Sequence, residues 1–163
     1  MTISKIYPCL WFDGTAEQAA QSYTSLFPDS HIDSVNRSAA DNPSTTAGAV
    51  LTVEFTLAGQ KFLGLNGGPE FHFTEAVSFT IDCADQAEVD RYWEGLIDGG
   101  GEASRCGWLK DRFGLSWQVV PRALPEFLDS PDREAAARAM KAMLEMTKID
   151  IARLQDAFEG VGV

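Results

Sequence analysis

The stretch that decides the fold is residues 51–66, LTVEFTLAGQKFLGLN. From Leu51 to Leu57, apolar residues alternate with threonine and glutamate. Side chains of a strand point alternately to the two faces of its sheet, so this alternation predicts a strand with one buried face. Ala58-Gly59-Gln60 then turns the chain, and Lys61–Asn66 returns as a second strand. The stretch therefore predicts a β-hairpin.

Three further elements are predicted ahead of this hairpin. The run Ile6–Phe12 is aromatic and apolar and predicts a strand. Thr15 is placed to cap a helix whose apolar residues recur at helical spacing as far as Phe27, where Pro28 follows and stops it. His31–Arg37 is a candidate second strand. The first unit is thus strand, helix and three strands.

A second unit of the same kind begins near residue 77. Apolar residues alternate over residues 77–81 and predict a strand. An apolar stripe from Val89 to Ile97 predicts a helix, which ends at three consecutive glycines. Short strands are predicted around Ala103–Leu109 and Leu115–Val120, joined by a turn at Lys110–Gly114. This order repeats that of the first unit.

The two units resemble internal copies, and a repeat decides architecture. Three pairs of residues occupy matching positions: Asp13 and Asp82 at the end of the first strand, Tyr23 and Tyr92 ten residues later, and Asn66 and Gln118 nine residues after the leucine that precedes the final turn. The predicted fold class is α+β, with two paired βαβββ modules forming a curled mixed-sheet barrel. The modules are expected over about residues 1–69 and 70–125 of one domain.

The repeat also predicts where a ligand would bind. Each module has one sheet face covered by its own helix and one bare face. Two bare faces that curl around a shared cleft bury themselves and leave a concave pocket. We therefore expect a small-molecule site between the modules.

The C-terminal part, residues 126–163, is expected to form a helical extension. Asp129-Ser130-Pro131 marks a helix start, and the alanine-rich sequence after it predicts one helix with an apolar face. That face carries Met140, Met143, Leu144, Thr147, Ile151, Leu154 and Phe158. It could pack on its own barrel or on a second subunit, and a homodimer is the favoured interpretation.

Composition narrows the class of partner. The chain has 163 residues, 45% of them hydrophobic, and a net charge of −11. Such an acidic surface repels nucleic acids and anionic membranes. No apolar stretch is long enough to cross a membrane, and no signal peptide is apparent, so a cytoplasmic protein is expected. The three cysteines lack metal-site spacing; Cys9 and Cys83 are interpreted as core residues.

Several phrases of this sequence resemble one known family. They are Leu10–Gly14, Leu65–Pro69, Asp82-Cys83, Cys106–Gly114, Ser116–Pro121 and the late Lys148–Ile151. Together they are similar to the PhnB-like proteins, a family often filed as demethylubiquinone methyltransferases. That family belongs to the vicinal-oxygen-chelate superfamily, with the glyoxalase, bleomycin-resistance and dioxygenase fold. The resemblance implies a βαβββ repeat, a homodimer and a site in each cleft.

Metal-dependent members of this superfamily use four ligands, mostly histidine and glutamate. The resemblance carries these ligands to positions near Tyr7, Ala76, Asn66 and Gln118, and none of the four is a histidine or a carboxylate. A neutral amide is a poor ligand for a transition metal. No metal and no other cofactor are therefore predicted.

Two amides and several aromatic residues remain as binding candidates. Asn66 and Gln118 each offer a donor and an acceptor, and aromatic neighbours would line an apolar pocket suited to a planar molecule. The alternative is that the amides bond to each other or to the backbone and that the aromatic residues are core. The cleft candidates are Tyr7, Trp11, Asn66, Phe71, His72, Phe79, Cys106, Trp108, Trp117 and Gln118.

Catalytic interpretations of single residues are weaker than structural ones. His72 follows the Gly67-Gly68 turn, and its interpretation as a loop histidine is preferred to that as a catalytic base. For Cys106, the interpretation as a structural thiol is preferred to that as a nucleophile, because no base or cation cluster accompanies it. Gly67-Gly68 leads into Pro69 and not into a helix, so the glycine-rich loop of many S-adenosylmethionine enzymes is missing.

The sequence thus predicts a small-molecule-binding protein without an assigned activity, and whether it is an enzyme is open. The first alternative is a metal-dependent lyase, isomerase or dioxygenase with other ligands. The second is a methyltransferase, as the family label suggests.

Overall fold

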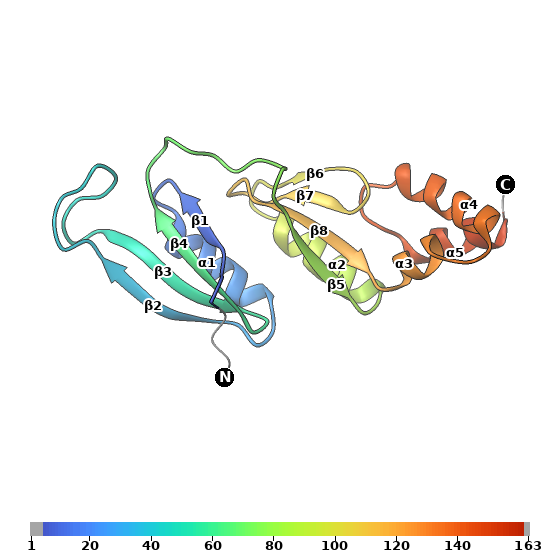
Figure 1. Ribbon diagram of the computed structural model, residues 1–163, viewed down its shortest axis with the longest axis horizontal. Coiled ribbons are helices and arrows are strands. Elements are labelled where there is room, and N and C mark those ends of the chain that lie inside the picture. Colours follow the sequence, from blue (N-terminus) through green and yellow to red (C-terminus); the bar gives the residue numbers. More distant parts are fainter. Residues whose placement is uncertain (1–4, 162–163) are drawn as a thin grey trace. The chain divides into compact units, whose positions relative to one another are not determined.

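The structure is a computed structural model that describes residues 5–161. The chain divides into two compact units, Met1–Phe73 and Thr74–Val163 (Figure 1). Each unit contains one four-stranded mixed sheet with a helix between its first and second strands. The predicted α+β class with two βαβββ repeats is therefore confirmed. No helix of the described chain has the length and apolar character needed to span a membrane.

The first unit consists of β1 (Cys9–Phe12), α1 (Ala16–Leu26), β2 (His31–Arg37), β3 (Val50–Leu57) and β4 (Gln60–Asn66). The strand order in the sheet is β1-β4-β3-β2. The first and last strands, β1 and β4, are parallel neighbours, and the other pairs are antiparallel. The hairpin from which the fold was predicted is thus present as β3 and β4.

The core of the first unit lies between this sheet and α1. Phe55 and Phe62 stack in it with ring centroids 5.5 Å apart, and Tyr23 of the helix is 1% exposed. The helix approaches the sheet closely because small residues meet: a Cβ added at Gly64 would lie 3.2 Å from the Cβ of Ala16. Burial of these apolar side chains is the main force that holds the helix on the sheet.

The second unit begins with β5 (Phe79–Cys83), α2 (Gln86–Ile97), β6 (Glu102–Ala103), β7 (Trp108–Lys110) and β8 (Ser116–Pro121). The strand order is β5-β8-β7-β6, the same pattern as in the first unit. The Asp85 side chain accepts a hydrogen bond from the backbone N–H of Glu88 and caps α2.

Two expectations for the second unit need correction. Its first strand starts at Phe79, and Val77 lies before it with 64% of its surface exposed. The strand expected around Ala103–Leu109 is two short strands instead, β6 and β7. The break lies at Cys106 and Gly107, whose φ angles are +57° and +82°, a left-handed conformation that a strand does not accommodate.

The C-terminal extension contains α3 (Ala123–Leu128), α4 (Arg133–Leu144) and α5 (Ile151–Glu159). The prediction of one helix after Pro131 is therefore wrong. After Glu145 the chain leaves the helical path, and the backbone carbonyls of Met146 and Thr147 bond to the N–H groups of Cys106 and Gly107. Because these two carbonyls bond to residues outside the helix, the series of helical hydrogen bonds ends at this point.

The extension packs on its own unit mainly through residues that were not part of the expected apolar face. Met146, Ile149 and Leu154 are at most 2% exposed and cluster with Leu124. Of the seven residues expected on that face, only Leu154 is buried, so the interpretation that the face packs on a second subunit stays a prediction. Two apolar side chains of α4, Met140 and Leu144, remain 45% and 54% exposed.

Candidate functional site

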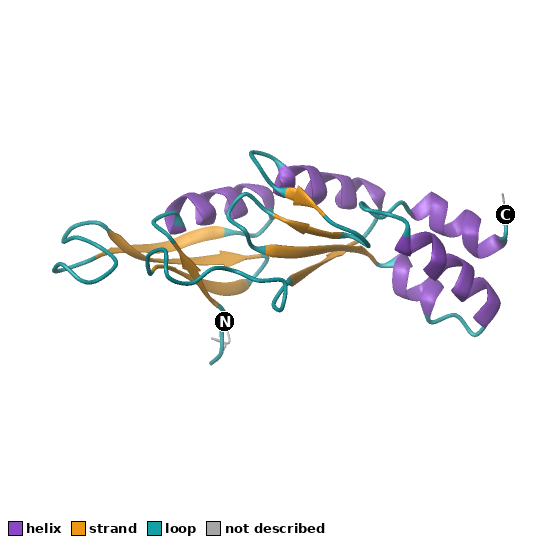
Figure 2. Cartoon of the chain, turned by 90° about the horizontal axis from the view of Figure 1, so that it is seen from above, coloured by secondary structure: helices purple, strands orange, loops and turns teal. Residues whose placement is uncertain are grey.

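Each sheet has one face covered by the helix of its unit and one face without a helix (Figure 2). We call the second face the helix-free face. In the first unit, Cys9, Trp11, Lys61, Leu63 and Leu65 point to it. In the second unit, Thr80, Trp108, Lys110 and Gln118 point to it, whereas Val120, further along β8, packs against the C-terminal helices. Strand alternation decides this assignment, because the residues between them are the buried ones.

Asn66 lies on the helix-covered face and not on the helix-free one. Its Oδ1 accepts a hydrogen bond from the backbone N–H of Ala16 at 2.9 Å, and its Nδ2 donates to the carbonyl of Val50 at 3.0 Å. The residue is 5% exposed. Its amide thus performs the N-terminal capping of α1 that was expected from Thr15, whose side chain makes no capping bond. The Asn66 amide thus bonds to the backbone, which was the alternative to a role in ligand binding.

Gln118 lies on the helix-free face of the second unit. It is opposite Trp108 in the antiparallel pair and opposite Thr80 in the parallel pair. Its Nε2 donates a hydrogen bond to the Oγ of Ser78 at 2.9 Å, which fixes the orientation of the amide. Its carbonyl oxygen accepts no hydrogen bond from the residues that the structure describes. This half-buried amide can therefore accept a bond from a ligand.

Trp11 is held rigidly on the helix-free face of the first unit. Its Nε1 donates to the carbonyl of Gly68 at 2.8 Å, and its ring meets Phe71 edge-on with centroids 4.9 Å apart. The ring covers Gly67 so closely that a Cβ there would lie 2.2 Å from it. Phe71 is 58% exposed. Trp11 and Phe71 are thus brought together as an aromatic pair.

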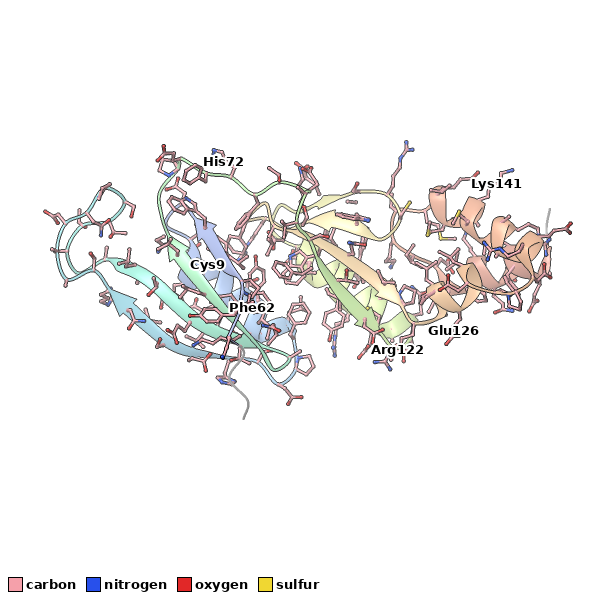
Figure 3. The ribbon with its side chains drawn as sticks, in the orientation of Figure 1. Cys9, Phe62, His72, Arg122, Glu126 and Lys141 are labelled. Atoms are coloured by element: carbon pink, nitrogen blue, oxygen red, sulfur yellow. The ribbon has the colours of Figure 1, made fainter. Side chains whose placement is uncertain are left out.

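Tyr7 and His72 lie outside the regular elements of the first unit. Tyr7 is 39% exposed, and the Nζ of Lys61 lies 5.0 Å from its ring centroid. His72 is exposed on the segment after β4, and Figure 3 shows it well apart from Cys9 on β1. Cys9 is exposed too, so its interpretation as a core residue is wrong. No pair of a base and a nucleophile is assembled from these residues.

Phe79 and Trp117 lie on the helix-covered face of the second unit. Their ring centroids are 5.7 Å apart, and Trp117 is 3% exposed. The Nε1 of Trp117 donates to the Oδ2 of Asp111 at 2.9 Å. The Oδ1 of Asp111 accepts from the backbone N–H groups of Phe113 and Leu115. Phe79 and Trp117 therefore belong to the core rather than to a ligand face.

Asp111 is a structural residue that sequence reasoning explained only as turn chemistry. It is 5% exposed and ties the β7–β8 turn to the indole of Trp117. The available signal was a turn aspartate followed by a tryptophan six residues later on the next strand. Buried carboxylates need such donors, since burial of an unpaired charge is costly.

Two of the three cysteines, Cys9 and Cys83, are not activated as thiolates. Burial raises the pKa of the Cys83 thiol to about 12, and partial burial also raises the pKa of Cys9. Both thiols therefore stay protonated at neutral pH. Cys106 is half-buried, and its backbone N–H donates to the carbonyl of Met146 at 2.9 Å. All three cysteines are free.

The four positions at which the resemblance implies metal ligands do not fit a metal ion. Ala76 has no donor atom, and both ends of the Asn66 amide are bonded to the backbone. Within residues 5–161, no group of three or more histidine, cysteine, aspartate or glutamate side chains is placed to hold a metal. We therefore derive no chemistry from a metal at these positions.

The glycines of the first unit do not form a phosphate- or cofactor-binding loop. Gly67 and Gly68 are followed by a segment without helix that continues to residue 78. The N-terminus of α1 has its first N–H, that of Ala16, bonded to Asn66. A Rossmann-type site needs a glycine-rich turn that leads into a helix with free N–H groups. The described residues contain none.

The chain is similar to one protein family and to several solved structures. The family model described as 3-demethylubiquinone-9 3-methyltransferase matches residues 4–120. A solved structure described as a putative 3-demethylubiquinone-9 3-methyltransferase, PhnB protein, from Bacillus cereus shares 34% identity with a TM-score of 0.66. That match covers 72% of this chain and 99% of the Bacillus cereus chain. No curated protein matches the chain.

Two more distant structures show the fold alone. Protein PA1353 from Pseudomonas aeruginosa is 18% identical with a TM-score of 0.60, and the match covers 73% of this chain and 98% of that one. The fosfomycin resistance protein FosX from Listeria monocytogenes, solved with Mn(II) and sulfate, is 15% identical with a TM-score of 0.51. That match covers 79% of this chain and 98% of FosX.

The family match covers more than half of the sequence and coincides with the two βαβββ repeats. The chain therefore belongs to the family described as 3-demethylubiquinone-9 3-methyltransferase.

Proposed function

We propose that this PhnB-like protein binds a small, planar organic molecule on the helix-free faces of its sheets. The observation that carries the proposal is the row formed by Ser78, Gln118 and Trp108 in the second unit. Ser78 orients the Gln118 amide, and Trp108 is its neighbour across the β7–β8 pair. A half-buried amide next to an indole ring offers one directed hydrogen bond beside an apolar surface.

This arrangement favours one class of ligand. A planar aromatic ring would stack on the indole of Trp108, and a hydroxyl or amine on that ring would donate to the carbonyl oxygen of Gln118. Lys110, at the end of the same face, is already paired with Glu75. Hydrogen bonding to Lys110 lowers the pKa of the Glu75 carboxyl, so the pair stays ionised and adds little net charge to the face.

The first unit supports the same ligand class independently. The half-buried Trp11 and the exposed Phe71 form an aromatic pair, and Gly67 and Gly68 keep the indole in one position. A rigid aromatic surface loses little conformational freedom when a ligand binds, which favours affinity. The helix-free face of the first unit therefore offers a second aromatic surface for the same class of ligand.

The experiment is equilibrium dialysis of the full-length protein with 2-naphthol, a planar ring with one hydroxyl. We expect Gln118→Leu to weaken binding about tenfold, the loss of roughly 1.4 kcal/mol. The stability of this variant in urea should stay close to that of the wild type. Gln60→Leu, at the exposed β3–β4 turn, is the matched control and should bind normally. Unchanged binding by Gln118→Leu would contradict the proposal.

Two enzymatic functions remain as alternatives. Methyl transfer is favoured by the description of the family model, and protection of the fold by S-adenosylmethionine in a thermal-shift assay would support it. Metal-dependent lyase, isomerase or dioxygenase chemistry would need ligands other than Asn66. Elemental analysis of the untagged protein, before and after incubation with zinc, nickel, manganese and iron(II), tests this alternative, and about one ion per chain would favour it.

The remaining expectations from the sequence stay proposals. They are a curled barrel, a homodimer and a cytoplasmic location. The exposed Met140 and Leu144 on α4 are apolar side chains that a second subunit would cover. Sedimentation equilibrium of the wild type and of a Leu144→Glu variant tests this contact, and a wild-type monomer at micromolar concentration would contradict it.

A further inference from the structure

The segment Met146–Ile151 between α4 and α5 is bound along its backbone by the second unit. The N–H of Cys106 donates to the carbonyl of Met146 at 2.9 Å, and that of Gly107 to the carbonyl of Thr147 at 2.7 Å. We call this segment the strap. It has no regular secondary structure of its own before α5, yet its successive main-chain carbonyls at Met146 and Thr147 accept hydrogen bonds from the second unit.

Gln86, the first residue of α2, holds the other end of the strap. Its Nε2 donates to the carbonyl of Ile149 at 3.1 Å, and its Oε1 accepts from the N–H of Ile151 at 2.9 Å. One side-chain amide thus bonds to the main chain on both sides of Asp150. The Nζ of Lys148 adds an ion pair with Asp90 at 2.7 Å.

The strap touches a part of the second unit that is conformationally unusual. Cys106 has a φ of +57°, a conformation that residues other than glycine adopt rarely, and Gly107 follows with +82°. Gly107 is enclosed as well, because a Cβ there would lie 2.8 Å from the carbonyl oxygen of Val119 and 3.1 Å from Cγ1 of Ile149. Backbone of this kind persists where its surroundings determine it.

This turn leads directly into the candidate ligand face. The N–H of Trp108 donates to the carbonyl of Arg105 at 3.0 Å, and the N–H of Val119 donates to the carbonyl of Gly107 at 2.8 Å. Residues 105–108 therefore form one hydrogen-bonded unit that ends at the indole beside Gln118. A shift of the Cys106-Gly107 turn would displace Trp108.

We propose that the strap is a positioning element for the ligand face, with Gln86 as its positioning residue. It fixes the left-handed turn at Cys106 and Gly107 and so places Trp108 next to Gln118. The consequence for affinity rests on the proposed function, whereas the placement of Trp108 does not. The family model matches residues 4–120 and so does not include the strap, although Lys148–Ile151 is one of the phrases that resemble the family.

The test uses the full-length protein labelled with 5-fluorotryptophan and the variant Gln86→Ala. We expect hydrogen exchange at the amides of Cys106 and Gly107 to become at least about tenfold faster, because their acceptors are released. The fluorine resonance of Trp108, assigned with Trp108→Phe, should shift, and the affinity for 2-naphthol should fall about tenfold. Gln21→Ala, an exposed glutamine of α1, is the matched control.

Two results would overturn the inference. One is unchanged exchange at Cys106 and Gly107 in Gln86→Ala. The other is faster exchange with an unchanged Trp108 resonance, since the strap would then be only a structural contact. Gln86→Glu should give partial rescue, because a carboxylate still accepts from the N–H of Ile151. If Gln86→Ala does not fold, the milder Ile149→Val is measured in the same way.

Failure of the proposed function gives a different pattern. If Trp108→Ala binds 2-naphthol as the wild type does, the ligand face is wrong. The fluorine and exchange measurements then still decide whether the strap places Trp108.

Discussion

The Oδ1 of Asn66 accepts a hydrogen bond at 2.9 Å from the backbone N–H of Ala16, a residue 50 positions earlier in the chain. The last residue of β4 therefore caps the first turn of α1. Its Nδ2 bonds to the carbonyl of Val50, so one buried side chain joins a helix and two strands of the first unit. This amide is a structural group, although its type and position resemble those of a ligand-binding residue.

Replacing Asn66 by alanine is expected to destabilise the protein by about 2 kcal/mol, because a buried donor and a buried acceptor lose their partner. Urea denaturation measures the change. Asn36→Ala, on the exposed strand β2, should change the free energy of unfolding by less than about 0.5 kcal/mol. Equal effects of the two variants would show that the capping bond contributes nothing.

Gly67→Ala tests the contact that holds Trp11. The added Cβ would lie 2.2 Å from the indole, so the ring must move, and we expect a loss of about 2 kcal/mol. In a Trp11→Ala background the same substitution should cost less than about 0.5 kcal/mol, since the obstacle is gone. A double-mutant cycle in urea measures both values. Additive effects would mean that Gly67 is needed for another reason.

Trp117→Phe removes the indole donor from the buried carboxylate of Asp111 and keeps an aromatic ring in the core. A hydrogen bond to a charged group contributes more than a neutral one, so we expect a loss of about 2 kcal/mol in stability. Trp108→Phe, on the helix-free face, should be closer to neutral. The reverse order of the two losses would contradict the assignment of Trp117 to the core.

The ion pair between Lys148 and Asp90 makes the strap sensitive to acid. Bonds from Lys148 and then Gln86 lower the pKa of the Asp90 carboxyl below its usual 3.8. A lowered folded-state pKa stabilises the protein above the unfolded-state pKa, and this stabilisation is lost as pH falls through the folded-state value. The Asp90 side chain is 41% exposed, so solvent screening keeps the contribution small.

We therefore expect Lys148→Met to be less stable than the wild type by about 0.5 kcal/mol at pH 7. The difference should shrink as the pH falls below 3.8 and also when the salt concentration is raised to about 1 M. Urea denaturation at several pH values measures it. A difference that grows on acidification would contradict the role of this pair.

The main elements of both units could be predicted because their periodicity is clear. The alternation in β3 and the helical stripe that contains Tyr23 depend on local sequence, and both lie where they were expected. The break between α4 and α5 could not be predicted in this way. It depends on hydrogen bonds to Cys106 and Gly107, residues far away in the chain.

The sequence also did not predict on which face of its sheet each of the two amides, Asn66 and Gln118, would lie. Asn66 and Gln118 were matched by counting from the leucines before the final turns. The structure pairs Phe12 with Asn66, whereas Ile81, the counterpart of Phe12, pairs with Val119. The cause is the turn: residues 58–59 connect β3 to β4, but residues 111–115 connect β7 to β8. A shift of one residue moves a side chain to the opposite face of a sheet.

The parallel pairing of the first and last strands in each sheet has a consequence for the order in which the chain folds during synthesis. Within residues 5–161, β1 pairs only with β4, so the strand that begins at Cys9 has no neighbour until the strand that contains Leu63 has been made. β5 likewise waits for β8, where Phe79 meets Trp117. Pairing of parallel strands that lie far apart in the sequence is slow, and an unpaired strand exposes its backbone until the pairing occurs. Each βαβββ sheet can therefore be completed only after its final strand has been synthesised.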